Sequence, residues 1–302
     1  MCRWCVITKR KEMGHLVVSP LLIFILVAGV PPAMADEGPP RAAQLLADQR
    51  YREAKEVLEK AVRANGNDAA ARYYLGRTYL ALCTYDDAIE HMKQAVWLAQ
   101  DKALYHFWLG RAYGEKAKRA NPFKQASLAG KIRKEFERAI ALEPGNIDTR
   151  NALGNFYVQA PSFMGGGTKK ARAQAKVLTE LDALRGKLLY ARIDEQGKET
   201  ARAFSLYQKL EKQYTTFADA SVFYGAYGQF LRRQKRYDEA IKAFTKQLEL
   251  QPHNLSARLR LAGVYEAVDR MQDAESEYKK VAAVSPGCIP VKYRRGRPRQ
   301  LH

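Results

Sequence analysis

Apolar side chains recur along this chain in a helical rhythm that itself repeats. The segment "RYYLGRTY" at residues 72–79 returns in altered form as "HFWLGRAY" at 106–113, a shift of 34 residues. A second helical pattern follows each segment, in which a small residue precedes a large one, as Ala88 precedes Met92. The pattern predicts a chain built from pairs of amphipathic helices. Further copies of the first segment are "RNALGNFY" at 150–157, "YGAYGQFL" at 224–231 and "RLRLAGVY" at 258–265.

These segments resemble the tetratricopeptide repeat, which joins a W-x2-L-G-x2-Y segment to a later A-x3-F segment and a proline in a period of about 34 residues. Pro144, Pro252 and Pro286 stand where the second helices are expected to end. The resemblance implies an all-α fold, a right-handed superhelical solenoid of about seven helix-turn-helix repeats. The expected repeats lie at about 35–68, 69–102, 103–146, 147–183, 184–217, 221–254 and 255–288, within a solenoid domain from 36 to 288.

Residues 1–35 have the pattern of a secretory signal peptide. Basic residues precede an apolar run from Leu16 to Val30, and Ala33-Met34-Ala35 supplies the small residues that a signal peptidase requires. As a helix the run rises about 22 Å, less than the hydrocarbon core of about 30 Å, so a cleaved signal is favoured over a permanent anchor. We therefore expect an exported protein, periplasmic or otherwise extracytoplasmic after cleavage near Ala35.

Cleavage at that point leaves two cysteines, Cys83 and Cys288. A disulfide needs a Cα separation of about 5.5 Å, which residues far apart in a linear array do not reach. Both are therefore predicted to be free thiols. The fold is then expected to be held by apolar packing alone.

Positive charge exceeds negative charge, with a formal net charge of +19. Such an excess favours acidic partners through long-range attraction. The final segment, "GCIPVKYRRGRPRQLH", is basic and lacks helical periodicity, so residues 289–302 are predicted to form a basic disordered tail. Contact with a membrane is expected only through this tail or an uncleaved signal, and no nucleic acid partner is expected outside the cytoplasm.

The stretch "APSFMGGGTKKA" at 160–171 separates the two expected helices of the fourth repeat. A nucleotide-binding P-loop needs G-x4-G-K-[ST] after a buried strand, whereas here the lysines follow Thr168 and no strand precedes. The stretch is therefore predicted to be an elongated connector in which the Thr168 hydroxyl caps the next helix. An anion site at that helix N-terminus is the alternative.

The third repeat is also too long at the equivalent turn, through "EKAKRANPFKQASLAGK" at 115–131. Insertions in adjacent repeats project from the same edge of a solenoid, which would gather apolar side chains inside a basic rim and form a partner site. The alternative is that each aromatic ring packs back onto its own helix pair. The predicted insertion-edge patch consists of Phe123, Phe163, Met164, Lys169 and Lys170.

In tetratricopeptide repeats the fifth and ninth residues of the first helix usually face the concave groove. Arg77 and Arg111 would then stack along the groove and bind carboxylates through their planar guanidinium groups. The implied ligand is a protein or peptide with an acidic stretch or a free C-terminal carboxylate, and the alternative is that both arginines are simply solvated. The predicted groove residues are Tyr73, Arg77, Phe107, Arg111, Asn151, Asn155, Arg192 and Gln229.

The resulting hypothesis is a non-catalytic protein–protein interaction scaffold in the cell envelope. The alternatives are a chaperone-like assembly factor that holds envelope clients, and an enzyme with its site in the inserted loops. No cofactor and no metal are expected, because the histidines lack metal-ligand spacing and no catalytic motif is recognisable. The tryptophans and tyrosines at helical spacing are predicted to be core residues.

Overall fold

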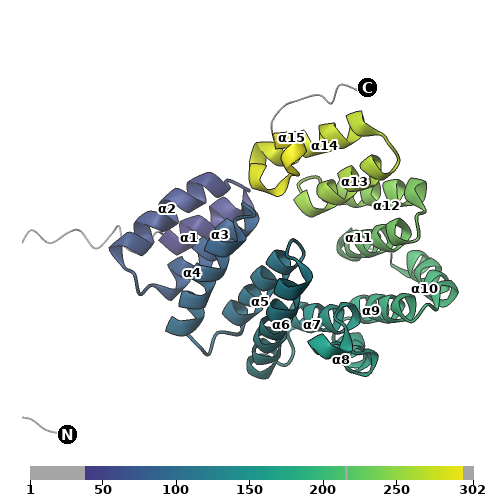
Figure 1. Cartoon of the computed structure of the whole chain (residues 1–302), viewed down its shortest axis with the longest axis horizontal. Helices are drawn as coiled ribbons and strands as arrows, with labels where there is room; N and C mark the ends of the chain where they lie inside the picture. Colours follow the sequence, from purple (N-terminus) through teal and green to yellow (C-terminus); the bar gives the residue numbers. More distant parts are fainter. Residues whose placement is uncertain (1–37, 215–216, 295–302) are drawn as a thin grey trace, which may run out of the picture.

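The structure, a computed structural model, describes residues 38–214 and 217–294 (Figure 1). Every regular element within these ranges is helical, as predicted, and none of the helices there is both long and apolar enough to cross a membrane. The predicted signal peptide lies outside the described residues. The helices form seven pairs: α1 (Gly38–Ala47) with α2 (Tyr51–Ala64), α3 (Ala69–Ala81) with α4 (Tyr85–Leu98), α5 (Ala103–Ala117) with α6 (Pro122–Leu142), α7 (Ile147–Gln159) with α8 (Thr168–Leu181), α9 (Ala183–Gln196) with α10 (Thr200–Gln213), α11 (Phe217–Arg233) with α12 (Tyr237–Leu250), and α13 (Leu255–Ala267) with α14 (Met271–Val284).

Several first helices begin at an Asn or Asp that caps its own helix. The Asp68 carboxylate accepts a hydrogen bond from the Ala71 backbone N–H at 2.9 Å. Asn146 and Asn254 cap α7 and α13 in the same way. A cap of this kind stabilises a helix by about 1 kcal/mol, so the local sequence alone specifies where these helices begin.

The turn inside a pair repeats one backbone conformation. In five of the seven pairs, a residue other than glycine sits in the left-handed region with φ between 57° and 66°. This conformation costs such a residue about 1–2 kcal/mol, so its recurrence indicates that the packing of the paired helices imposes it. The residues are Gln49, Cys83, Lys198, Lys235 and Asp269.

The two pairs without this turn are the ones that carry insertions. In the third pair the extra residues lengthen the helices, so that α5 runs to Ala117 and α6 spans 21 residues. In the fourth pair a short 3-10 turn, η2 (Ser162–Met164), precedes Gly165 and Gly167, whose φ angles are 92° and 150°. Gly167 is the N-cap of α8 and Thr168 its first residue, so the predicted hydroxyl cap is wrong. Glycine conformations make this turn without a side-chain cap.

Within a pair, glycine on the first helix allows an aromatic ring of the second helix to pack against its backbone. A Cβ atom on Gly110 would lie 2.7 Å from the ring of Phe136, and one on Gly228 would lie 2.8 Å from the ring of Phe244. Both rings are buried. The close approach of the paired helices therefore depends on the missing side chain.

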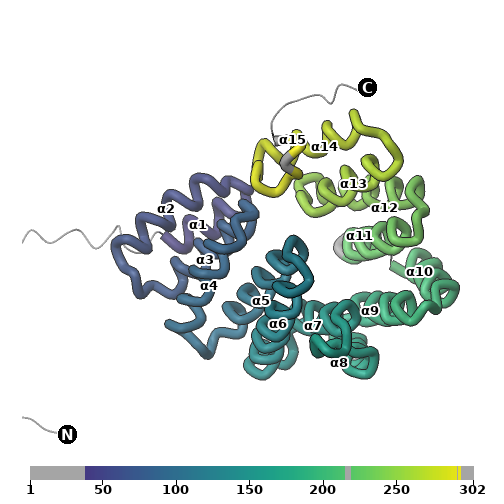
Figure 2. The backbone as a smooth tube through the Cα atoms, viewed as in Figure 1, coloured from purple at the N-terminus to yellow at the C-terminus, as the bar shows by residue number. Residues whose placement is uncertain are grey.

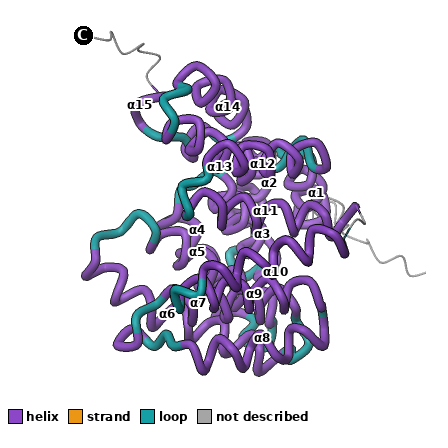
Figure 3. The backbone as a smooth tube through the Cα atoms, turned by 90° about the vertical axis from the view of Figure 1, so that its right-hand side faces the viewer, coloured by secondary structure: helices purple, strands orange, loops and turns teal. Residues whose placement is uncertain are grey.

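The stacked pairs curve into a ring, and the last pair lies beside the second (Figures 1 and 2). Viewed from the side, helices make up nearly all of the ring and loops are confined to the connections between them (Figure 3). Cys83 and Cys288 form a disulfide with a Cα separation of 5.2 Å. The prediction of two free thiols is therefore wrong, because it treated the array as linear. Curvature accumulated over the intervening repeats brings residues 205 positions apart into contact.

The chain after α14 is ordered as far as the structure describes it. Residues Pro286–Cys288 form the 3-10 turn η3, and Val291–Arg294 form α15. Ile289 is buried, and the Tyr293 hydroxyl donates a hydrogen bond to Glu266 at 2.9 Å. The predicted disordered tail is thus wrong for residues 289–294, which this anchoring holds against the last pair. Residues 295–302 lie outside the described part of the chain.

Two alanine substitutions on α5 test the role of glycine at the contact between paired helices. Gly110→Ala should lower the free energy of unfolding by about 1–3 kcal/mol, because the added methyl group overlaps the Phe136 ring. Gly114→Ala is the matched control: apart from the adjacent residues and backbone of its own helix, nothing lies within 4 Å of its added methyl group. It should stabilise the helix by up to about 1 kcal/mol. Urea unfolding measures both, and equal effects would refute the packing argument.

Candidate functional site

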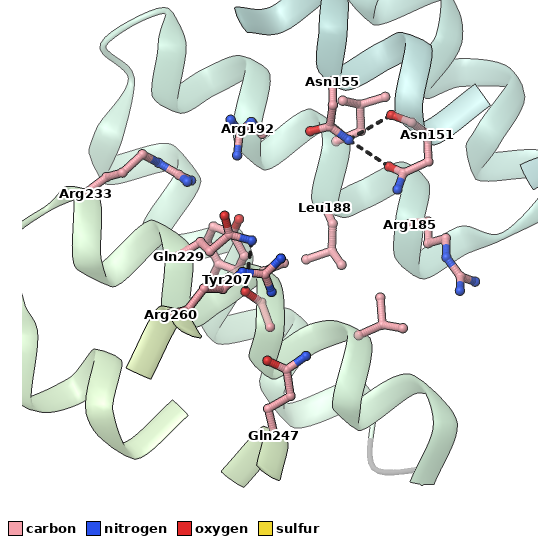
Figure 4. Close-up of a pocket in the computed structure, with 14 residues that line it drawn as sticks. Asn151, Asn155, Arg185, Leu188, Arg192, Tyr207, Gln229, Arg233, Gln247 and Arg260 are labelled. Carbon is pink, nitrogen blue, oxygen red and sulfur yellow. Dashed lines mark hydrogen bonds between the residues drawn. The ribbon is translucent and has the colours of Figure 1, made fainter. Parts of the chain in front are cut away.

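Two cavities open on the inner side of the ring. The seam cavity, of about 580 Å³, lies between α3 and α5 on one side and α13 with Cys288 on the other. The central pocket, of about 220 Å³, is lined mainly by α7, α9 and α11 (Figure 4). Arg260 of α13 lines both cavities, so the two share one wall. Together the two adjoining cavities form the candidate site.

Cationic side chains dominate the lining of both cavities. The sole carboxylate among the lining residues is Glu115, and it already pairs with Lys118 at 2.6 Å. Such an excess of one charge makes the inner surface attractive to anions. The cationic lining residues are Arg77, Arg111, Lys118, Arg119 and Arg260 in the seam cavity, and Arg185, Arg192, Arg233 and Arg260 in the central pocket.

The guanidinium groups of the seam cavity are arranged around Trp108. The Cζ atoms of Arg77 and Arg111 each lie 4.4 Å from the centre of the Trp108 ring. Cation–π contact holds both planar groups without using their hydrogen-bond donors. Arg77 also contacts the Tyr73 hydroxyl at 3.4 Å, but its buried Nε has no partner. The Arg77 guanidinium therefore retains one buried donor without a partner in the described chain.

Five of these arginines form no ion pair with a carboxylate of the described chain, whereas Arg185 pairs with Asp182 and Arg233 with Glu195. The five are Arg77, Arg111, Arg119, Arg192 and Arg260. Surrounding protein desolvates Arg111, Arg192 and Arg260 and lowers the pKa of each guanidinium. Neighbouring positive charge lowers the pKa further, from Arg233 in the case of Arg192 and from Arg232 in the case of Arg260. The ring thus concentrates cations that a bound anion would stabilise.

Neutral polar groups line the rest of the central pocket. The Asn155 amide donates to the backbone and side-chain oxygens of Asn151 at 2.8 and 3.0 Å (Figure 4). Gln247 is buried and donates to the Ser221 carbonyl at 3.2 Å, while its own amide oxygen has no partner. The pocket therefore offers both donors and acceptors beside its arginines.

Most, but not all, of the predicted groove residues face these cavities. Arg77 and Arg111 line the seam cavity, whereas Asn151, Asn155, Arg192 and Gln229 line the central pocket. Tyr73 and Phe107 are buried in the core, and the prediction that they face the groove is wrong. Tyr73 stacks on Tyr105 of the next repeat, with ring centres 4.8 Å apart.

Two important lining residues, Trp108 and Arg260, were not predicted from the sequence. Trp108 was predicted to be core but is only partly buried. Both stand third in their eight-residue segments, "HFWLGRAY" and "RLRLAGVY", one place beyond the position assigned to the groove. The inner face therefore includes more positions of the first helix than the fifth and ninth residues alone. Trp108 and Arg260 occupy the same place in their segments, and this equivalence is the sequence signal that could have identified both.

The residues of the insertion-edge patch are only partly free. Phe123 is 89% exposed and Phe163 is 79% exposed, so the alternative in which these rings pack back onto their own helix pairs is wrong. Met164 is half-buried and lines a third cavity between α5, α6 and α7, which shares Arg111 with the seam cavity and Asn155 with the central pocket. Lys169 is exposed, whereas Lys170 donates to the Gly165 carbonyl at 3.1 Å.

His106 is buried and makes polar contacts. Its Nδ1 lies 2.6 Å from the Glu135 carboxylate, and its Nε2 lies 3.2 Å from the Gln100 carbonyl. No group of three His, Cys, Asp or Glu side chains within 38–214 and 217–294 is placed to hold a metal ion. His106 thus joins α5 to α6 through a hydrogen bond as well as through packing.

Comparison with known proteins identifies the repeat in this chain. A family model described as tetratricopeptide repeat matches residues 45–106 and 231–293. The chain is 26% identical over 89 residues to Protein O-mannosyl-transferase TMTC3 of Mus musculus, a match that covers 27% of this chain and spans 10% of the length of that protein.

Two solved structures share the fold. A tetratricopeptide repeat protein from Parabacteroides merdae has a TM-score of 0.55 at 12% identity, over 87% of this chain and 96% of that one. The human IFIT1 dimer with PPP-AAAA has a TM-score of 0.50 at 20% identity, over 82% of this chain and 54% of that one. At these identities the similarity concerns the fold alone.

Removing one uncompensated charge should stabilise the protein. Arg192→Met replaces a partly buried guanidinium by an uncharged side chain of similar length, and should raise the free energy of unfolding by about 1 kcal/mol at low salt. Salt should reduce the gain by screening repulsion from Arg233. Urea unfolding at two salt concentrations measures the effect.

Arg258→Met is the matched control for that substitution. Arg258 pairs with the nearly buried Glu277 at 2.8 Å, so its loss should lower the free energy of unfolding by about 1–3 kcal/mol. If Arg192→Met destabilised the protein as much as Arg258→Met, Arg192 would have a stabilising partner and the uncompensated-charge argument would fail.

Proposed function

We propose that this chain, which is a tetratricopeptide-repeat protein, is a non-catalytic scaffold that binds an extended, carboxylate-bearing segment of another protein on the inner surface of its ring. Solenoids of this kind characteristically use their concave surface to bind proteins and peptides. The observation that carries the proposal is the set of arginines that line the two cavities without carboxylate partners.

The chemistry of the lining favours carboxylates over apolar ligands. Guanidinium groups match the planar, two-oxygen geometry of Asp, Glu and a chain terminus. The Trp108 ring contacts the guanidinium groups of Arg77 and Arg111, each at 4.4 Å from the ring centre. Because these contacts already restrict the two arginine side chains, less side-chain entropy is lost when a ligand binds. In the central pocket, Asn151 and Gln229 offer hydrogen bonds to the backbone of an extended segment.

Export to an envelope compartment is part of the same proposal. The pattern of residues 1–35 is that of a secretory signal, and cysteines form lasting disulfides mainly outside the cytoplasm. The Cys83–Cys288 disulfide supports this location. An acidic protein segment is then the anion favoured as a ligand, because nucleic acid is scarce there.

Fluorescence anisotropy with a labelled oligoglutamate peptide tests the proposal. The oxidised protein should bind the peptide, and affinity should fall as salt is added. Arg111→Ala should weaken binding by about tenfold, the loss expected for one charge-assisted contact. Arg138→Ala is the matched control, because Arg138 is exposed on α6 and lines neither cavity.

Two results would contradict the carboxylate hypothesis. Equal losses from Arg111→Ala and Arg138→Ala would mean that binding follows net charge and not the inner surface. Tighter binding of a single-stranded oligonucleotide than of an oligoglutamate with the same charge would indicate a phosphate ligand.

The insertion-edge patch is a second candidate surface, because Phe123 and Phe163 expose most of their rings. Replacing both by Ser should leave the melting temperature within about 2 °C of the parent, since neither ring packs in the core. Crosslinking to a partner in the native host should decrease. A marked drop in melting temperature, measured by circular dichroism, would show that the rings have a structural role instead.

A further inference from the structure

The ring is closed at a seam where the second helix pair meets the last. Cys83, in the turn between α3 and α4, forms the disulfide with Cys288 of η3. The Ser285 hydroxyl donates to the Ala81 carbonyl at 2.9 Å, and the Gln49 amide donates to the His253 carbonyl at 2.6 Å. Arg119 donates to the Cys288 carbonyl at 3.5 Å, and a Cβ atom on Gly287 would overlap the Leu82 carbonyl oxygen. The disulfide is thus the covalent part of a junction that also contains hydrogen bonds and a close backbone contact.

Apolar packing does not continue across this seam. The buried cluster of the last pair, built around Tyr278, Val281 and Ile289, includes no residue of α1–α4 among those the structure describes. The cluster of the first pairs, built around Leu58 and Leu75, likewise includes none from α13 or α14. Because the hydrophobic effect holds every other junction of the solenoid, this junction depends unusually on its covalent bond.

Positive charges face one another across the seam. Arg77 and Arg111 line the seam cavity from α3 and α5, and Arg119 lines it from the turn after α5, while Arg260 lines it from α13 on the opposite side. Glu115, the one carboxylate among the residues that line this cavity, forms an ion pair with Lys118. Glu115 also attracts Arg260 across the seam, so the charges there include an attraction between the two ends as well as like charges.

The seam cavity is a product of closure. Two of its walls come from opposite ends of the solenoid, so Arg260 joins Arg77 and Arg111 only when the ring is shut. Cys83 is half-buried and also borders a separate cavity of about 410 Å³ beside the ends of α5 and α6. A small thiol can therefore reach the disulfide.

We propose that the Cys83–Cys288 disulfide is a redox latch: when oxidised it closes the ring and assembles Arg77, Arg111 and Arg260 into one binding site for a carboxylate-bearing segment, and when reduced it opens the ring and releases that segment. The ligand in this inference rests on the function proposed above. The opening of the ring does not.

The redox step uses a dithiol reductant as the co-reactant. One of its thiolates attacks a sulfur of the disulfide, the S–S bond breaks, and the other cysteine leaves as a thiolate that takes up a proton. The second thiol of the reductant then displaces the first cysteine from the mixed disulfide. Cys83 and Cys288 together gain two electrons and two protons, and the reductant becomes a cyclic disulfide.

Small-angle X-ray scattering with and without dithiothreitol tests the opening of the ring. The radius of gyration should increase on reduction, while the helical circular dichroism signal stays constant. The double variant Cys83→Ser with Cys288→Ser should have the larger radius in both conditions. An unchanged radius overturns the latch, and a large loss of helical signal also overturns it, because the disulfide would then be needed for folding itself.

Anisotropy with labelled oligoglutamate tests the assembly of the site. Reduction should weaken binding by about tenfold, and Arg260→Ala in the oxidised protein should weaken it by a similar factor. Reducing Arg260→Ala should then add little, because both changes remove the same contact. Arg138→Ala serves as the control and should respond to reduction as the parent does.

The outcomes separate the two proposals. If the oxidised protein binds the peptide but neither reduction nor Arg260→Ala weakens binding, the assembly of the site by closure is wrong and the scaffold function stands. If the oxidised protein does not bind the peptide, the proposed function and the ligand of the latch are both wrong. If reduction and Arg260→Ala each weakened peptide binding and their effects multiplied in the reduced variant, the proposal that closure assembles the site would also be wrong.

Discussion

Each helix pair in this protein has an apolar face that only the next pair can cover, and every larger feature depends on that requirement. Stacking must continue from pair to pair until the chain ends. Where an aromatic ring such as Phe136 packs on the backbone of Gly110, the contact holds paired helices close together. Repeated through seven pairs, this stacking curves the array until its ends meet.

Closure gives the protein an inner surface unlike its other surfaces. Arg111 and Arg260 are surrounded by protein on this surface, which raises the cost of keeping them charged and unpaired. A site of this kind lowers the free energy of unfolding, because its guanidinium groups are positioned for a ligand but unpaired without one. The contacts of Arg77 and Arg111 with Trp108 reduce this loss of stability, because the aromatic ring partly compensates the two charges.

The helices and their pairing were predictable because they depend on residues close in sequence. Amphipathic spacing, the glycine contacts and the pairing of a small with a large residue all act within about 34 residues, the length of one repeat. The positions of Arg77 and Arg111 followed from the same register, as did those of Asn151 and Arg192 in the central pocket. Tyr73 was misplaced because neighbouring repeats pack more closely over it than the helical register alone reveals.

By itself, the sequence determined an all-α stack of helix pairs and the approximate placing of several basic side chains on its inner face. Only the tertiary structure decided that the stack closes, that Cys83 and Cys288 are bonded, that residues 289–294 are anchored, and that Arg260 shares a cavity with Arg111. These features depend on curvature summed over the whole array. A small rotation at each junction leaves no mark in a local pattern, yet it decides which residues meet at opposite ends of the chain.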